Sequence, residues 1–323
     1  MKFGLLSTAG IARKSFLPAV ESTDHEVTAV ASRDVERARS FATDHSIPTT
    51  YDGYEALFDD ADVDAVYIPL PNGLHAEWTK RAADAGIDVL CEKPLAVDAE
   101  QAREVVDYCA DRDVTLMEAF MYRYHPRTER AVELADEELE GVCSATASFK
   151  FPLFDQPGDI RLSPDLAGGS LMDVGCYAVS AVRQFLGEPD RAYAFAADSK
   201  NTGVDTELAG VLEYESGASA RVACGFDTQM VQRYRVEGKN GWVEARDAFN
   251  PSSQSVELEY RIDGRHAVET FDPVDQYRLE VAEFVASVDE GREPRTGGSE
   301  AIANMRVIDA LYRSAESERS VAV

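Results

Sequence analysis

Residues 2–20 read KFGLLSTAGIARKSFLPAV, an apolar run that breaks at Ser7–Gly10 and continues with apolar residues at helical spacing. This pattern predicts a buried strand, a tight turn of small residues and a helix. The free N–H groups at the start of such a helix attract anions, because they carry the positive end of the helix dipole. The stretch therefore predicts a turn that can hold a phosphate.

The turn departs from the glycine fingerprint G-x-G-x-x-G of dinucleotide-binding proteins. Its three glycine positions, which serve the tight turn, the approach of the pyrophosphate and helix packing, fall on Ser7, Ala9 and Ala12. Ala12 is an accepted substitute, Ala9 adds one methyl group, and the Ser7 hydroxyl can itself donate to phosphate. Because the anion is held by backbone N–H groups, we still expect a pyrophosphate site here, made by Ser7, Thr8, Ala9, Gly10, Ile11 and Ala12.

The end of the next predicted strand indicates which dinucleotide binds. An NAD enzyme presents an acidic residue there to the ribose 2′-OH, whereas this chain has Ser32 and Arg33, followed by Arg37. A hydroxyl and planar guanidinium groups suit the dianionic 2′-phosphate of NADP. Asp34 lies one residue beyond the strand and is expected to face solvent. The sequence favours NADP and leaves NAD possible.

Residues 1–120 alternate short apolar runs with helical stretches. Strands are expected at 2–7, 27–32, 65–70, 88–93 and 114–119, which is typical of parallel βαβ units with helices on both faces. We therefore predict an α/β fold that begins with a doubly wound Rossmann domain. The boundary of this domain is expected near residues 118–124.

Residues 121–323 have a different texture. Short, mostly alternating strands predict an α+β domain with a large, mostly antiparallel open sheet. Helical patterns return at 277–291 and 299–317, and these helices could pack back on the first domain. An open sheet face with Tyr193, Phe195 and Val222 would need a partner, so a homodimer or homotetramer through this sheet is expected.

The composition bounds the partners and the compartment. The chain has 323 residues, 59 acidic against 32 basic residues and a net charge of −27, which disfavours nucleic-acid and membrane partners. Acidic residues throughout and only seven lysines are typical of salt-adapted, halophilic proteins, with an ordinary acidic protein as the alternative. We expect a cytoplasmic protein, because five scattered cysteines without a CxxC motif suit reduced thiols and no signal peptide or membrane span is apparent. No metal-ligand spacing is present.

Several motifs carry a resemblance that covers nearly the whole chain. They are GLLSTAGIA (4–12), YIPLPNGLHAEW (67–78), VLCEKPLAVDAEQA (89–102), EAFMYRYHP (118–126) and AGGSLMDVGCYAV (167–179). The chain thereby resembles the Gfo/Idh/MocA family of oxidoreductases, which contains glucose-fructose oxidoreductase and inositol dehydrogenase. The form GGSLMDVGCY is similar to the branch of dimeric dihydrodiol dehydrogenases and NADP-dependent D-xylose dehydrogenases, in which Tyr follows Asp by four residues.

The resemblance implies a dehydrogenase acting on CH–OH groups, with Lys93, Asp173 and Tyr177 as catalytic residues. Lys93 follows a parallel strand at the edge where such sheets gather ligands, and the family implies a cis Lys93–Pro94 bond, although a trans bond is commoner. Asp173 and Tyr177 are four apart in an expected helix, where they would share a face. We expect hydride transfer from the anomeric carbon of a pyranose aldose such as xylose or glucose to nicotinamide, giving a lactone, with Tyr177 taking the hydroxyl proton.

Other positions are less determined by the sequence. The cofactor is further expected to touch Pro69, Asn72, His75, Glu92, Lys93 and Pro94, although His75 could be purely structural. The sugar is expected to touch Lys93, Arg123, Tyr124, Arg161, Asp173 and Tyr177, although surface ion pairs explain the arginines equally well. Cys176 is explained by packing alone. Reduction of a keto or anhydro sugar, oxidation of a trans-dihydrodiol, and a non-catalytic NAD(P)-sensing regulator remain alternatives.

Overall fold

The computed structural model describes residues 1–60, 62–154, 156, 158–251 and 254–323. The chain folds into two compact units. The first comprises Met1–Phe120 and Asp275–Ile302, and the second comprises Met121–Val274 and Ala303–Val323. The sequence places the boundary near residue 120 and lets the C-terminal helices pack back on the first domain, and the segment 275–302 lies in the first unit.

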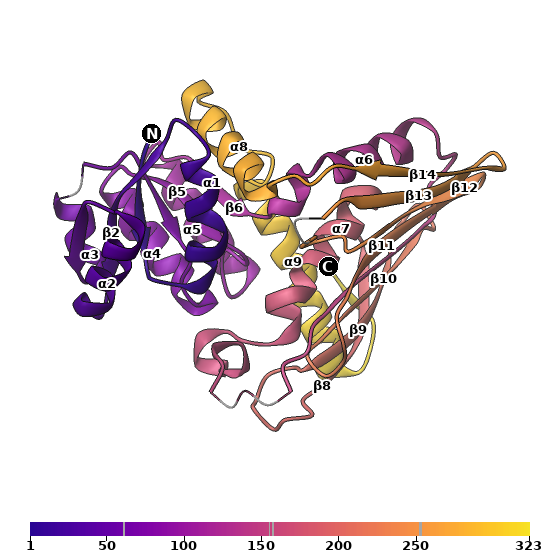
Figure 1. Cartoon of the computed structure of the whole chain (residues 1–323). Coiled ribbons are helices and arrows are strands. Elements are labelled where there is room, and N and C mark those ends of the chain that lie inside the picture. Colours follow the sequence, from indigo (N-terminus) through magenta and orange to yellow (C-terminus); the bar gives the residue numbers. More distant parts are fainter. Residues whose placement is uncertain (61, 155, 157, 252–253) are drawn as a thin grey trace. The chain divides into compact units, whose positions relative to one another are not determined.

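The described residues of the first unit form a parallel sheet of six strands in the order β3-β2-β1-β4-β5-β6. Figure 1 labels β2, β5 and β6 of this sheet. Its strands are β1 (Lys2–Leu6), β2 (Glu26–Ser32), β3 (Thr49–Asp52), β4 (Ala65–Ile68), β5 (Asp88–Glu92) and β6 (Leu116–Ala119). From β1 the chain adds strands first on one side of the sheet, as far as β3, and then on the other side, from β4 to β6. In such sheets ligands bind beyond the carboxyl ends of the strands at this switch point between β1 and β4. The turns after β1, β4 and β5 are therefore the candidate positions for a cofactor.

Helices cover both faces of this sheet, which explains why its strands read as apolar runs. The helices are η1 (Ala12–Phe16, π-helical), α1 (Leu17–Glu21), α2 (Val35–His45), α3 (Tyr54–Asp60), α4 (Asn72–Asp84), α5 (Ala99–Ala110), α8 (Gln276–Glu290) and the first residues of α9 (Gly298–Ser317). On one face, residues of α3, α4 and α5 pack with Leu6, Val66 and Val89 of the strands. On the other face, Phe16 stacks on Tyr67 at 4.0 Å, and Phe284 of α8 lies 6.1 Å from Phe3.

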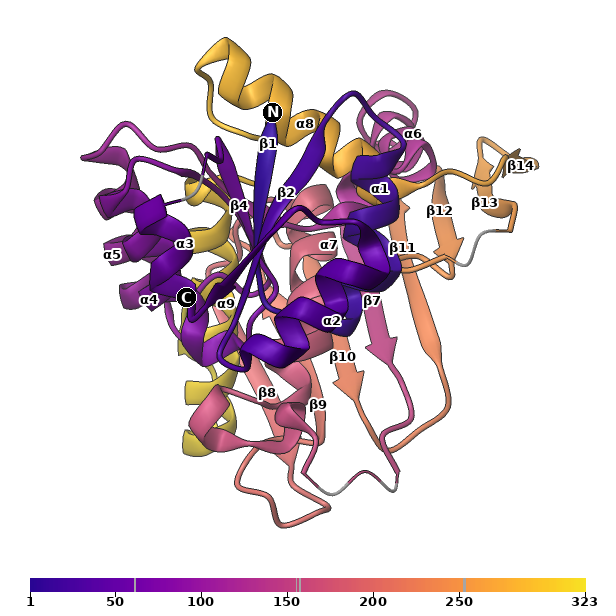
Figure 2. The ribbon, with the colours of Figure 1, turned by 60° about the vertical axis from the view of Figure 1, so that its left-hand side comes forward.

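The second unit contains a sheet whose described strands number nine, in the order β14-β13-β12-β11-β7-β10-β9-β8-β15. They are β7 (Ser144–Lys150), β8 (Arg191–Ala197), β9 (Glu207–Glu213), β10 (Ser219–Gly225), β11 (Val231–Gly238), β12 (Gly241–Arg246), β13 (Val256–Ile262), β14 (Arg265–Phe271) and β15 (Val321–Ala322). Figure 2 shows β7, β10 and β11 side by side. All of the described pairs are antiparallel except β7 with β10.

One face of this sheet is covered by helices. The helical segments of the unit are η2 (Met121–Tyr124), α6 (Pro126–Glu137), η3 (Ile160–Leu162), η4 (Pro164–Leu166), η5 (Leu171–Gly175, π-helical), α7 (Cys176–Leu186) and the rest of α9. Helix α7 packs on β7, β10 and β11, and α6 packs on β12 and β13. Residues of β9, β10 and β11 alternate between buried and more exposed, as an antiparallel sheet with one open face requires.

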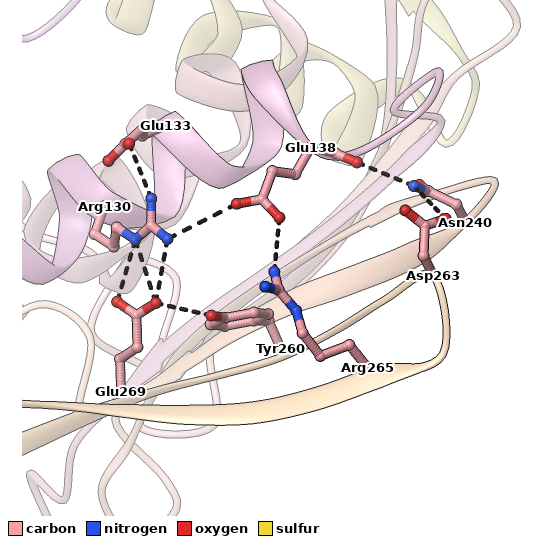
Figure 3. Close-up of polar contacts among 8 residues, drawn as sticks. All are labelled: Arg130, Glu133, Glu138, Asn240, Tyr260, Asp263, Arg265 and Glu269. Carbon is pink, nitrogen blue, oxygen red and sulfur yellow. Dashed lines mark hydrogen bonds and ion pairs between the residues drawn. The ribbon is translucent and has the colours of Figure 1, made fainter.

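Polar contacts anchor α6 to the far end of the sheet (Figure 3). The guanidinium of Arg130 pairs with Glu133 and Glu269, and its Nη2 lies 3.8 Å from Glu138. Glu138 also pairs with Arg265 at 2.7 Å, and Glu269 accepts a hydrogen bond from Tyr260. These contacts connect the helix to the β13–β14 hairpin.

The architecture agrees with the fold class that the sequence predicts, with a parallel Rossmann sheet and a second, mostly antiparallel sheet. Some details differ. Strands β3, β12 and β15 were not expected: β3 and β15 are short, and β12 is a strand through its pairing with β11 and β13. Val222, which was expected on the open face, is 3% exposed and points toward the helices, whereas Tyr193 and Phe195 are 49% and 69% exposed.

Candidate active site

The turn after β1 keeps the backbone geometry of the fingerprint without its glycines. Ser7, at the first glycine position, has φ of 124°, a backbone conformation that residues other than glycine rarely adopt. Its N–H donates to Ala31 O at 2.9 Å. A Cβ atom built on Gly10 would meet no protein atom within 4 Å, so the space beside this residue is open. The residues therefore fit a pyrophosphate at the start of the helix.

Two arginines lie near this turn, Arg33 just after β2 and Arg37 in the first turn of α2. Arg37 Nη2 is 3.4 Å from Oγ1 of Thr8, and the charges of Arg33 and Arg37 both act on the hydroxyl of Tyr54. Burial raises the pKa of Tyr54 while these two cations oppose the rise. The Ser32 hydroxyl is buried and accepts a hydrogen bond from Asp34 N at 3.2 Å. The described part of the turn thus offers positive charge where a 2′-phosphate is expected.

Asp34 has a structural role in the same region. Its carboxylate caps α2 by accepting hydrogen bonds from Glu36 N and Arg37 N. The residue is exposed, as expected from the sequence. Asp34 therefore acts as the N-cap of α2.

Lys93 lies just beyond the carboxyl end of β5. The Lys93–Pro94 peptide bond is cis, as the family resemblance implied. Lys93 is half-buried, whereas Pro94 and Leu95 are buried. The neighbouring strand β4 is followed by the buried Pro69 and by Asn72 at the start of α4.

His75 is fully buried, and its expected contact with the cofactor stays a prediction. Its Nδ1 lies 2.7 Å from Pro94 O and its Nε2 lies 2.7 Å from Leu70 O, so both ring nitrogens face the main chain. Burial lowers the pKa of His75 to about 4, although the two carbonyls favour its protonated form. At neutral pH the ring therefore carries one hydrogen and donates it to one of the two carbonyls in each tautomer.

Glu92 belongs to a polar cluster inside the first unit. The Tyr67 hydroxyl donates to Glu92 Oε1 at 2.6 Å, and the negative charge of Glu92 also acts on Tyr277 and Glu280 of α8. Glu280 is 2% exposed, and burial followed by the charge of Glu92 raises its pKa well above the usual value. The contact with the cofactor expected for Glu92 stays a prediction.

Asp173 and Tyr177 lie where η5 meets α7. Asp173 sits in the π-helical turn, and Arg161 Nε is 3.0 Å from its Oδ2. Tyr177 is 5% exposed, and its hydroxyl lies 3.4 Å from Sδ of Met121. Cys176 is buried beside them, which agrees with a packing role.

Aromatic rings surround Tyr177, and no spacing in the sequence identifies them. The ring centroids of Phe149, Phe249 and Tyr122 lie 5.4, 5.6 and 5.9 Å from that of Tyr177. These residues come from β7, from the segment after β12 and from η2, which are far apart in the chain. Only the folded sheet brings them together, and they hold the phenol ring in one orientation.

The remaining substrate candidates occupy different surroundings. Arg161 bridges Asp159 and Asp173. Arg123 Nη1 lies 3.3 Å from the Ser180 hydroxyl, and the residue is half-buried. Tyr124 is 2% exposed, and its expected contact with a sugar stays a prediction.

The described residues contain no cluster of three or more His, Cys, Asp or Glu side chains able to hold a metal ion. Within the same residues, no helix has the length and apolar character needed to cross a membrane. The five cysteines are free thiols, and all except Cys143 are buried.

The class of protein follows from three features: the turn after β1 where the strand order reverses, the cationic groups beside it, and the lysine after β5. Together they are typical of a dinucleotide-dependent oxidoreductase with a Rossmann domain. Two family models match the chain: the oxidoreductase family with an NAD-binding Rossmann fold over residues 1–120, and the C-terminal domain of GFO/IDH/MocA proteins over residues 130–244. The chain belongs to the Gfo/Idh/MocA family of oxidoreductases.

Similar proteins extend over almost the full chain. D-xylose 1-dehydrogenase (NADP(+)) 2 of Haloferax volcanii is 56% identical over 322 residues, which cover 99% of each chain. A solved 3-ketoreductase from Actinomadura kijaniata, in complex with NADP and TDP-benzene, has a TM-score of 0.91 at 31% identity and covers 97% of each chain. A solved aldose-aldose oxidoreductase from Caulobacter crescentus, complexed with glycerol, has a TM-score of 0.92 at 30% identity and covers 100% of this chain and 99% of its own.

Proposed function

We propose that this protein is an NADP-dependent sugar dehydrogenase that oxidises the anomeric carbon of a pyranose aldose of the xylose or glucose type to a lactone. The observation that carries the proposal is the 56% identity, over 99% of both chains, to an NADP-dependent D-xylose 1-dehydrogenase. The two arginines and the serine at the end of β2 support NADP, because guanidinium groups bind a phosphate dianion with several donors at once.

The proposed reaction assigns a task to each catalytic residue. Bound NADP⁺ supplies the acceptor for the hydride that leaves the anomeric carbon. Tyr177, as the phenolate, takes the proton of the anomeric hydroxyl, so that the C–H bond and the O–H bond break and a carbonyl forms. The Lys93 ammonium favours that phenolate by its charge and binds the sugar. Asp173 orients a sugar hydroxyl, and its own position is fixed by Arg161.

The function is tested with purified protein, NADP⁺ and a panel of aldoses that includes xylose, glucose and arabinose. Absorbance of reduced cofactor should rise with at least one aldose, and the product should hydrolyse from a lactone to an acid. Turnover with no aldose would overturn the assignment. The same cuvette with NADPH and 3-keto sugars tests a second candidate, a keto-sugar reductase, which the fold shared with a 3-ketoreductase favours.

We further propose that two copies associate through the open face of the large sheet. The register places Tyr193, Val211 and Arg221 in one row across the sheet, which continues through Thr146 to Arg235. Tyr193, Phe195 and Val211 are 49%, 69% and 40% exposed, so an apolar patch lies beside arginines. A second acidic copy suits this face, because arginines there offset the repulsion between two chains of charge −27.

Light scattering tests the association. The wild type should give the mass of a dimer or tetramer, and Phe195→Glu should give the monomer. A monomeric wild type would contradict the proposal. From the acidic composition we also propose that the protein works in a salt-rich cytoplasm.

A further inference from the structure

The peptide unit that follows Pro94 is held at both of its polar ends by buried side chains. His75 Nδ1 lies 2.7 Å from the carbonyl oxygen of Pro94, to which it donates in the tautomer that carries its hydrogen on Nδ1. The N–H of Leu95, which belongs to the same peptide unit, donates to Glu118 Oε1 at 2.7 Å. His75 and Glu118 are 0% and 1% exposed, so water does not compete for either contact.

Each of the two side chains is itself fixed in the first unit. His75 lies in the first turn of α4, and its second nitrogen is 2.7 Å from Leu70 O. Glu118 lies in β6, and its main chain is bound on both sides by Thr296, whose carbonyl accepts from Glu118 N at 2.8 Å and whose hydroxyl donates to Glu118 O at 2.6 Å. The Pro94–Leu95 peptide is therefore gripped between two rigid elements.

Burying these two polar side chains stabilises the fold less than apolar side chains in the same places would. A buried carboxylate and a buried imidazole lose their hydration, and well-packed apolar residues often replace such groups without loss of stability. Stability alone therefore gives little reason for these residue types. They do, however, supply directional contacts that fix one peptide plane, which apolar side chains cannot do.

The residue whose position depends most directly on this peptide is Lys93. A lysine amine sits on a flexible four-carbon stem, so its precision depends on where the main chain holds its Cα atom. Pro94 has its φ fixed by the ring, and the peptide after it is gripped by His75 and Glu118. The main chain of Lys93 thus has little freedom to move away from its position after β5.

We propose that His75 and Glu118 are positioning residues that clamp the Pro94–Leu95 peptide and thereby hold Lys93 in its reactive place. The inference rests on the proposed catalytic role of Lys93. It assigns no contact with substrate or cofactor to either residue, and both act through the main chain. A displacement of about 1 Å at a reacting group can cost about 10²-fold in rate, which sets the size of the effect.

The first test measures activity. Glu118→Leu and His75→Leu should each lower kcat about 10- to 100-fold while the Kd for NADP stays within about 3-fold. Glu118→Gln keeps an oxygen acceptor for Leu95 N–H and should retain most of the kcat. Thr79→Val is the matched control, because it removes the polar group of another buried residue one turn along α4, and its kcat should match the wild type.

A double-mutant cycle separates positioning from general loss of structure. In a Lys93→Met background the same substitutions should change the residual kcat by less than about 2-fold, because the side chain through which they act is gone. Equal losses in both backgrounds would overturn the proposal. If Glu118→Leu or His75→Leu does not fold, Glu118→Ala and His75→Ala carry the same cycle. Glu118→Gln losing as much kcat as Lys93→Met would also overturn the proposal.

Hydrogen–deuterium exchange tests the clamp without using activity. The segment 93–98 should exchange faster in His75→Leu than in the wild type, and the Thr79→Val control should leave it unchanged. Unchanged exchange in His75→Leu overturns the clamp. Faster exchange together with full activity of Lys93→Met supports the clamp and instead contradicts the proposed function of Lys93, so the two failures are distinguishable.

Discussion

The hydroxyl of Tyr177 lies 3.4 Å from Sδ of Met121, within a group of aromatic rings. A thioether is a weak acceptor, so this contact holds the hydroxyl far less firmly than a carboxylate would. We expect Tyr177→Phe to lower kcat about 10²- to 10⁴-fold, because general base catalysis contributes that much, while the Kd for NADP stays within about 2-fold. Steady-state kinetics and fluorescence titration measure the two quantities.

Tyr234→Phe is the matched control for Tyr177→Phe. Tyr234 is buried in the same aromatic group, 6.4 Å from Phe249, and loses the same hydroxyl without any proposed proton transfer. Its kcat should stay close to that of the wild type. Equal activity of Tyr177→Phe and the wild type would refute the proton role.

Arg161 holds Asp173 through a 3.0 Å ion pair, and its other side contacts Asp159. Arg161→Leu leaves the Asp173 carboxylate without this partner, so we expect the KM for the sugar to rise about 10-fold or more, as expected when a charged partner is lost. Arg161→Lys keeps the charge and should recover part of the loss. The kinetics should be measured at saturating NADP⁺, and an unchanged KM in Arg161→Leu would show that this pair does not orient the sugar site.

The cofactor preference is predicted to follow the charge at the end of β2. Replacing Arg33 by Asp puts a carboxylate where a 2′-phosphate is expected, and kcat/KM for NADP should fall about 10²-fold relative to that for NAD. Arg39→Asp makes the same change of charge on α2, where Arg39 pairs with Glu36, and should leave the ratio unchanged. A ratio that moves equally in both variants would mean that only overall charge is measured.

The sequence could predict most of the fold because its signals are local. Apolar runs separated by helical patterns identify the parallel sheet, and the pattern around Lys93 and the turn at Ser7 follow from a few adjacent residues. The strand β12 escaped because its pairing with β11 and β13, rather than its own composition, makes it a strand. Assignment of residues 275–302 to the first unit depends in the same way on distant contacts, such as that between Phe284 and Phe3.

The sequence gives a signal for the candidate site only where a motif carries it. Lys93, Asp173 and Tyr177 stand in recognisable motifs, whereas Phe249 and Glu118 have no local signal and reach their positions only through the folded sheets. For His75 the sequence left both a ligand contact and a structural role open. The structure places its ring nitrogens 2.7 Å from the carbonyl oxygens of Leu70 and Pro94, which the sequence alone does not locate.

Glu280 is expected to make the stability depend on pH. Its pKa is raised in the folded protein by burial and by Glu92, so the folded state holds a proton that the unfolded state releases above about pH 4.5. The free energy of unfolding should therefore fall as the pH rises, by up to about 1.4 kcal/mol per pH unit, until the folded pKa is passed. Glu280→Gln should lack this slope and be more stable at pH 7.

Urea unfolding at several pH values from 5 to 7 (roughly one unit apart) measures the difference between the variants. Glu283→Gln is the control on the same helix. Burial acts to raise the pKa of Glu283, but hydrogen bonds from Arg292 outweigh it, so the pKa is lowered in the folded protein. The stability that Glu283 contributes is therefore present above its unfolded pKa and is lost only as the pH falls. The free energy of unfolding of Glu283→Gln should change with pH as that of the wild type does. If that of Glu280→Gln also changes with the wild-type slope, the explanation by a buried acid is refuted.

The stability is also predicted to need salt. At a net charge of −27 the acidic surface repels itself, and the Debye length grows from about 3 Å at 1 M to about 30 Å at 0.01 M salt, so dilute buffer leaves this repulsion unscreened. The Tm should fall steadily as KCl is lowered. Glu21→Gln, Asp24→Asn and Asp44→Asn remove three exposed charges together, and the combined variant should tolerate lower KCl because less repulsion remains. Calorimetry across a KCl series measures both effects, and equal Tm values at high and low KCl would remove the inference of salt adaptation.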